Sequence, residues 1–122
     1  MIKKRLLTLA DALDKLAVKP RKRFTFSLAG WFRREKICGT TACAVGLAST
    51  LPEFKRLGLK IHDYLPAFRD LRGWYAVQKF FGISYDAAEY LFSYTQYESN
   101  DTTKPKAVAD RIRALVNSGD RT

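Results

Sequence analysis

The stretch Ile2-Lys-Lys-Arg-Leu-Leu-Thr-Leu-Ala-Asp-Ala-Leu-Asp-Lys-Leu16 decides the fold class of this chain. Its apolar residues at positions 2, 6, 9, 13 and 16 recur at spacings of four and three, which places them on one stripe of an α-helix. The pattern stops near Pro20. The sequence therefore predicts a mainly α protein of about five helices, of which this helix is the first.

A second helix is expected from Thr40, with Thr40 or Thr41 as its N-cap and Pro52 after its end. Most residues between 42 and 49 are small, which lets neighbouring elements approach closely. We therefore expect this helix at the centre of the core.

Three further helices follow from apolar residues at helical spacing, over roughly 70–81, over 84–92, and from Thr102 or Thr103 onward. Gly82 is expected to close the first of them in a left-handed conformation, and Ser84 to cap the second. Pro105 fits the first turn of the last helix.

The remaining segments are less regular. Phe24, Phe26 and Leu28 alternate with polar residues, which predicts a short strand over 24–28 and leaves room for one short β-hairpin. Residues 60–68 are expected to be mostly loop.

The chain has 122 residues, 47% of them hydrophobic, which is ample for one core and short for two domains. We expect a single globular domain over residues 1–122, with a frayed tail from about residue 117. The predicted core comprises Leu6, Leu9, Leu13, Phe26, Ala42, Cys43, Gly46, Leu47, Trp74, Val77, Phe81, Leu91, Ile112 and Leu115.

Charge is the strongest compositional signal, with a formal net charge of +10 at pH 7. Residues 1–36 hold eleven Lys and Arg against three acids, whereas residues 81–103 hold four acids and no Lys or Arg. Such a balance favours anionic partners, here an acidic protein surface or a nucleic acid.

The apolar runs and the cysteine count bear on the cellular location and on membrane association. The longest apolar run, residues 42–48, is far shorter than a transmembrane helix, so no membrane partner is expected. Residues 1–9 imitate an export signal only weakly, because Asp11 and Asp14 interrupt the apolar stretch and no small-residue cleavage site follows. Two cysteines cannot build a disulfide framework. A cytoplasmic location is therefore expected.

The basic segment 19–36 interleaves cations with aromatic residues, a combination that suits nucleic acid. Its alternative interpretation is a solvated connector beside ordinary core aromatics. The candidate binding residues are Arg21, Lys22, Arg23, Arg33, Arg34 and Lys36.

A cysteine-based active site has weaker support. Cys38 precedes the expected second helix, where a thiol can have a lowered pKa, and His62 with Asp63 could supply a base and its orienting carboxylate. The alternative is that Cys38 and Cys43 are structural, because buried cysteine is common and usually inert. Too few Cys and His residues are present for a structural zinc site, and no glycine pattern matches a nucleotide fingerprint. We therefore expect no metal and no cofactor.

Five segments of the chain carry a resemblance to a known family: Phe24-Thr-Phe-Ser-Leu-Ala-Gly-Trp31, Cys38-Gly-Thr-Thr-Ala-Cys43-Ala-Val-Gly46, Phe80-Phe-Gly-Ile-Ser84, Ala88-Glu-Tyr-Leu-Phe92 and Thr103-Lys-Pro-Lys-Ala-Val-Ala-Asp-Arg-Ile-Arg113. Together they resemble a family of small phage and bacterial proteins with a Cys-Gly-Thr-x-x-Cys-x-x-Gly motif, whose function is not established. The resemblance implies phage ancestry and no mechanism. For a phage-encoded protein, the expected location is the cytoplasm of the host cell.

These observations favour a small basic accessory protein of phage type, and they favour a non-catalytic role over an enzyme. It would act by stoichiometric binding to a macromolecular partner, such as a host or host-defence component. The first alternative is a nucleic-acid-binding module that uses the basic segment 19–36. The second is a cysteine-dependent hydrolase.

Overall fold

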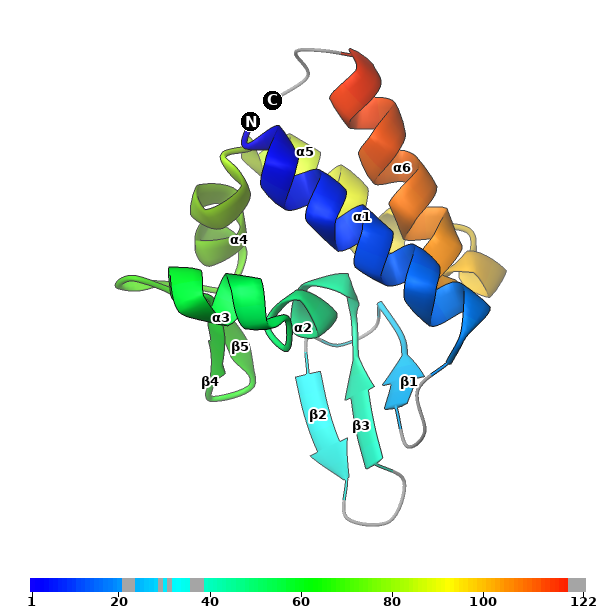
Figure 1. Ribbon diagram of the computed structural model, residues 1–122, viewed down its shortest axis with the longest axis horizontal. Coiled ribbons are helices and arrows are strands. Elements are labelled where there is room, and N and C mark those ends of the chain that lie inside the picture. The colour runs from blue at the N-terminus through cyan, green and yellow to red at the C-terminus, as the bar shows by residue number, and fades with distance from the viewer. Residues whose placement is uncertain (21–23, 29, 31, 36–38, 119–122) are drawn as a thin grey trace.

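The structure, a computed structural model, describes residues 1–20, 24–28, 30, 32–35 and 39–118 (Figure 1). Helices dominate it, which confirms the predicted mainly α class. The helices are α1 (Lys3–Val18), α2 (Ala44–Ala48), α3 (Pro52–Leu57), α4 (Trp74–Phe81), α5 (Tyr85–Phe92) and α6 (Pro105–Ser118), with short 3-10 turns at Tyr94–Gln96 and Ser99–Asp101.

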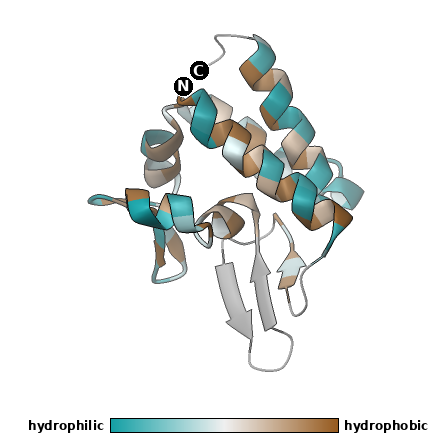
Figure 2. Cartoon of the chain, in the orientation of Figure 1, coloured by the Kyte–Doolittle hydropathy of each residue, from teal (hydrophilic) through white to brown (hydrophobic). Residues whose placement is uncertain are grey.

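Helix α1 forms where its apolar spacing predicts, and α6 lies alongside it (Figure 1). Leu9 and Leu13 of α1 and Ile112 of α6 are fully buried. Figure 2 shows both apolar and polar residues along each of these helices, as expected of amphipathic helices. At the outer edge of this pair, the Arg113 guanidinium lies 2.7 Å from a carboxylate oxygen of Asp11 and 2.6 Å from one of Asp14.

Helices α4 and α5 form the expected helical pair around Gly82, whose φ of 66° is left-handed. The Ser84 hydroxyl caps α5 by accepting a hydrogen bond from the Ala87 amide at 3.1 Å. The backbone N–H of Ile2 donates to the Phe81 carbonyl at 2.8 Å, so the start of α1 is bound to the end of α4.

Most of the predicted core is confirmed, and two positions need comment. Trp74 is only half-buried, because it begins α4 at the edge of the core. The side chain of Ala42 lies outside the described residues. The prediction missed several fully buried residues, chiefly Phe54, Phe80 and Leu59.

The first sheet has the order β1-β3-β2, with β1 (Phe24–Phe26), β2 (Phe32–Glu35) and β3 (Gly39–Ala42). The expected strand at 24–28 is present, but it pairs parallel to β3, and the antiparallel hairpin is β2 with β3. The expected helix from Thr40 is wrong at its start, because residues 39–42 are extended and α2 begins at Ala44. β-branched Thr40 and Thr41 favour a strand, and pairing on both sides holds β3 there.

The second sheet overturns the expected loop at 60–68. It is antiparallel, with the order β4 (Lys60–His62), β5 (Leu65–Phe68) and β6 (Leu71–Arg72), and its last strand delays the start of α4 to Trp74. Its two tight turns place Asp63, Tyr64 and Arg69 at positive φ, between 52° and 66°. Strands of two to four residues are too short to show a clear alternation in sequence.

The last helix begins at Pro105 and continues through Ser118, and residues 119–122 of the expected tail lie outside the described residues. None of the helices in the described part of the chain is long and apolar enough to cross a membrane.

The contact between Gly82 and Ile2 generates the first testable prediction. A Cβ at Gly82 would lie 3.0 Å from Ile2 Cγ1 and 3.3 Å from its backbone N, whereas one at Gly58 would meet Phe68 at an ordinary 3.7 Å. Both glycines close a helix at positive φ. We expect Gly58→Ala to cost about 1–2 kcal/mol through backbone strain alone. Gly82→Ala should cost a further ~1 kcal/mol or more through overpacking.

Urea denaturation of the two variants measures this difference. A double-mutant cycle with Ile2→Ala should recover part of the extra loss at Gly82. Equal losses in the two glycine variants would show that the start of α1 is not held tightly against Gly82.

Candidate binding surface

The Cys43 thiol belongs to the core. Its side chain is only 1% exposed, and its Sγ caps α2 by accepting a hydrogen bond from the Gly46 amide at 3.5 Å. Burial raises the pKa of Cys43 to about 11, so the thiol is protonated at neutral pH. A protonated, buried thiol is a poor nucleophile.

Unlike Cys43, His62 and Asp63 are exposed to solvent. They lie at the β4–β5 turn, with His62 Nε2 3.4 Å from Asp63 Oδ2 and with side chains that are 53% and 88% exposed. Cys38, the other candidate, lies outside the described residues. Cys43 instead lines a small pocket with Trp74 and Phe92. Among described residues, no three His, Cys, Asp or Glu side chains converge as metal ligands would.

The expected basic site is placed only in part. Arg33 and Arg34 belong to β2, where they pair with Thr41 and Thr40 of β3. The other candidates, Arg21, Lys22, Arg23 and Lys36, lie outside the described residues.

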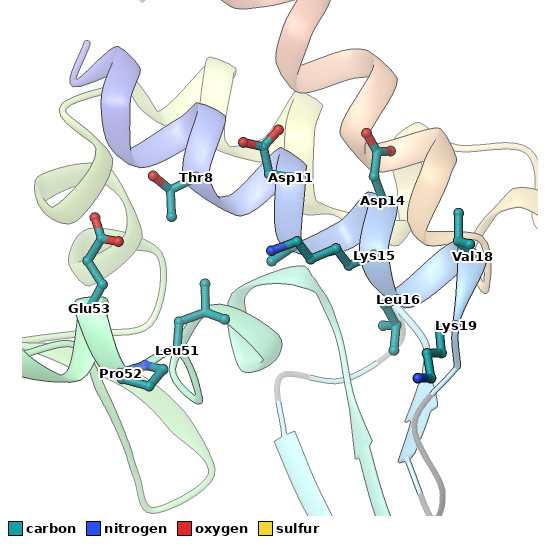
Figure 3. A pocket seen from close by; sticks show the side chains of 11 residues that line it. Thr8, Asp11, Asp14, Lys15, Leu16, Val18, Lys19, Leu51, Pro52 and Glu53 are labelled. Carbon is teal, nitrogen blue, oxygen red and sulfur yellow. The ribbon is translucent and has the colours of Figure 1, made fainter.

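Two open grooves differ in their charge. The first, between α1 and the start of α3, has a volume of about 860 Å³ (Figure 3). Its lining is mixed in charge, with Lys15 and Lys19 against Glu53, Asp11 and Asp14. The two aspartates already bind Arg113 of α6, so this groove offers no charge of a single sign.

The second groove is cationic. It lies between the start of α1, the β5–β6 turn, α4 and the turn before α5, and its volume is about 710 Å³. Arg5, Arg69 and Lys79 line it together with Tyr75, and no Asp or Glu is among its described lining residues. We call this site the cationic groove. Sequence reasoning missed it, because these residues are scattered along the chain.

Most of the tyrosines of this protein are exposed. Five of the six tyrosines are 43–71% exposed, namely Tyr64, Tyr75, Tyr85, Tyr90 and Tyr94. The sixth, Tyr97, donates its hydroxyl to the Leu91 carbonyl at 2.6 Å, and burial raises its pKa. Its ring lies 3.8 Å from the Arg111 guanidinium, which also lies 4.5 Å from the centre of the Tyr90 ring. Tyr85 packs edge to face against Trp74, so Tyr64, Tyr75 and Tyr94 are the three tyrosines that are more than half exposed.

No family model, curated protein or solved structure shows a match to this chain. Function therefore has to be inferred from the arrangement of its own residues.

The burial of Cys43 generates a second prediction. In a Cys38→Ser variant, which leaves one thiol, Cys43 should react with an alkylating reagent at pH 7 only as fast as the fold opens. The same variant unfolded in guanidinium should react at the ordinary rate of a thiol with a pKa of ~8.5. Mass spectrometry of timed samples measures both rates. Rapid alkylation of the folded variant would contradict the structural role and revive a cysteine nucleophile.

Proposed function

We propose that this chain is a small, basic, non-catalytic protein that acts by stoichiometric binding to a macromolecular partner. The observation that carries the proposal is the exposure of five of the six tyrosines. Tyrosine presents a large, rigid, amphipathic surface at a low cost in side-chain entropy, and it is enriched at the centres of interfaces. Rings left in water gain most when a partner covers them.

Tyr64 adds a second argument. It occupies the β4–β5 turn at a φ of 66° next to Asp63 at 52°, and it is 71% exposed. A two-residue turn with both φ angles positive favours Asn-Gly, because a bulky side chain is strained there by about 1–2 kcal/mol. The exposed ring regains little of that energy within the monomer. Backbone strain retained without a structural benefit points to function.

The environment of Cys43 supports a structural role for this one thiol, whereas Cys38, the candidate nucleophile, lies outside the described residues. The Cys43 thiol is buried in the core, whereas the His62 imidazole lies at an exposed turn. The phage ancestry implied by the sequence resemblance would make a component of the host cell the partner.

The proposal is tested with the tagged full chain and bacterial lysate, with and without nuclease. We expect a partner to co-purify, and light scattering of the complex to give a whole-number ratio of the two molecules. Tyr64→Asn and Tyr94→Ser should each weaken this association about tenfold or more, as interface anchors do. Tyr64→Asn should keep or raise the thermal midpoint, because asparagine tolerates the left-handed backbone.

Matched controls are Val18→Ser and Lys15→Gln, which alter exposed residues of the groove between α1 and α3, a groove that no tyrosine lines. They should bind as the parent does. If the tyrosine variants bind like the controls, or if no partner binds in a fixed ratio, the proposed function is wrong.

A further inference from the structure

We infer that the cationic groove binds single-stranded nucleic acid, with its cations on phosphates and Tyr75 stacked on a base. The inference rests on the proposed function, because it names the class of partner and the site that recognises it. The described lining residues of the groove all come from outside the segment 19–36, and four arguments support the inference.

The first argument is charge. Arg5, Arg69 and Lys79 line the groove, and none of its described lining residues is acidic. Asp70 and Asp86 lie close to lining residues in sequence, but they do not line the groove. A concave surface with charge of a single sign concentrates ligands of the opposite sign, and the net charge of +10 adds to this attraction.

The second argument is that Arg5 is already positioned. Its Nη1 donates a 2.7 Å hydrogen bond to the Phe80 carbonyl, and its guanidinium lies 4.5 Å from the centre of the Phe80 ring. One donated hydrogen bond leaves four N–H groups of the guanidinium to bind an anion. Because Phe80 is fully buried, the guanidinium rests on a rigid surface. A cation fixed before binding loses less entropy when the ligand arrives.

The third argument is the backbone of Arg69. It is an exposed residue with a φ of 56° in the β5–β6 turn, where glycine or asparagine would be less strained. Its guanidinium lies 5.0 Å from the centre of the Phe68 ring, at the groove. The turn thus retains a strained cation where a neutral residue would suit the fold better. The strain is consistent with selection for the charge.

The fourth argument is the exposed ring of Tyr75, which favours single-stranded nucleic acid over other anionic partners. Its ring is 70% exposed and lines the same groove as the three cations. An exposed ring beside phosphate-binding cations is the arrangement that holds single strands, because each unpaired base offers a face for stacking. Paired bases in a duplex are already stacked on one another, and an acidic peptide carries no base. Single-stranded nucleic acid therefore uses both features of the groove.

The test is fluorescence anisotropy with a labelled oligo(dT) of ~12 nucleotides, titrated with the full chain at several salt concentrations. Arg69→Asn and Lys79→Gln should each reduce the slope of log K against log salt by about 0.7, and the double variant by about 1.4. Tyr75→Ser should weaken binding about tenfold at every salt concentration and leave the slope unchanged, because stacking releases no counterion. A duplex of the same length should bind more weakly, and its affinity should change little in the Tyr75→Ser variant.

Matched controls distinguish this groove from the rest of the basic surface. Lys55→Gln with Lys60→Gln removes two exposed lysines that do not line the cationic groove. Combined neutralisation of Arg21, Lys22 and Arg23 to glutamine tests the basic segment. Thermal denaturation should place the midpoint of Arg69→Asn at or above that of the parent, so weaker binding cannot be ascribed to unfolding.

Each outcome decides between the possibilities. The inference fails if the oligonucleotide does not bind at low salt. It also fails if the groove variants bind like the lysine control, or if only the basic-segment variant changes the slope. The inference can fail while a protein partner still binds through the exposed tyrosines in the presence of nuclease. In that case the proposed function stands, with a protein as the partner. If neither partner binds, both proposals fail.

Discussion

The cluster of buried phenylalanine rings is the interaction on which the rest of the structure depends. Phe54, Phe68, Phe80, Phe81 and Phe92 come from α3, β5, α4 and α5, and neighbouring ring centroids lie 4.9–6.1 Å apart, mostly edge to face. Burying each ring contributes about 1.5–3 kcal/mol, and each favourable ring pair adds ~0.5–1.5 kcal/mol. Helix α3 has six residues and the strands of the second sheet have two to four, too few to be stable alone. These short elements exist because the cluster holds them.

The same cluster shapes the cationic groove. The Phe80 ring that packs inside against Phe54 and Phe68 also lies beneath the Arg5 guanidinium. Phe68 in turn lies beneath the guanidinium of Arg69. Both arginines are thus positioned by aromatic rings that the core fixes. Stability and the proposed recognition site share one set of side chains, so a mutation in the cluster is expected to disturb both.

The sequence predicted those elements whose determinants are local. Helix α1 follows from apolar spacing alone, and α5 from Ser84 as its cap. The prediction from sequence was wrong where pairing between strands decides the structure. Thr40 and Thr41 are extended in β3 because β1 pairs with it on one side, in parallel, and β2 on the other, antiparallel. The prediction was wrong again at residues 60–68, because the turn at Asp63 contains no glycine or asparagine to mark it. Left-handed backbone at such residues is invisible in a sequence pattern.

The candidate site was hidden for a similar reason. The distribution of charge along the chain points to the contiguous basic run near residue 21, whereas single cations elsewhere give no such signal. Arg5, Arg69 and Lys79 come from a helix, a turn and a second helix, and only the fold brings them to one groove. Their significance also depends on the lack of acids among the described residues of that lining, which no window of sequence can reveal.

The two turns at the ends of β5 show how the core and the surface are linked energetically. Tyr64 precedes β5 and Arg69 follows it, both at positive φ and both exposed. The left-handed backbone of each of these two residues costs about 1–2 kcal/mol relative to a residue that prefers it. That cost is comparable to the contribution of one buried phenylalanine, and β5 itself supplies Phe68 to the cluster. A strand held less firmly would let its turns relax, and their side chains would lose the fixed positions that binding requires. The packing of Phe68 against Phe80 is therefore what allows strained, exposed residues to persist at both ends of the strand.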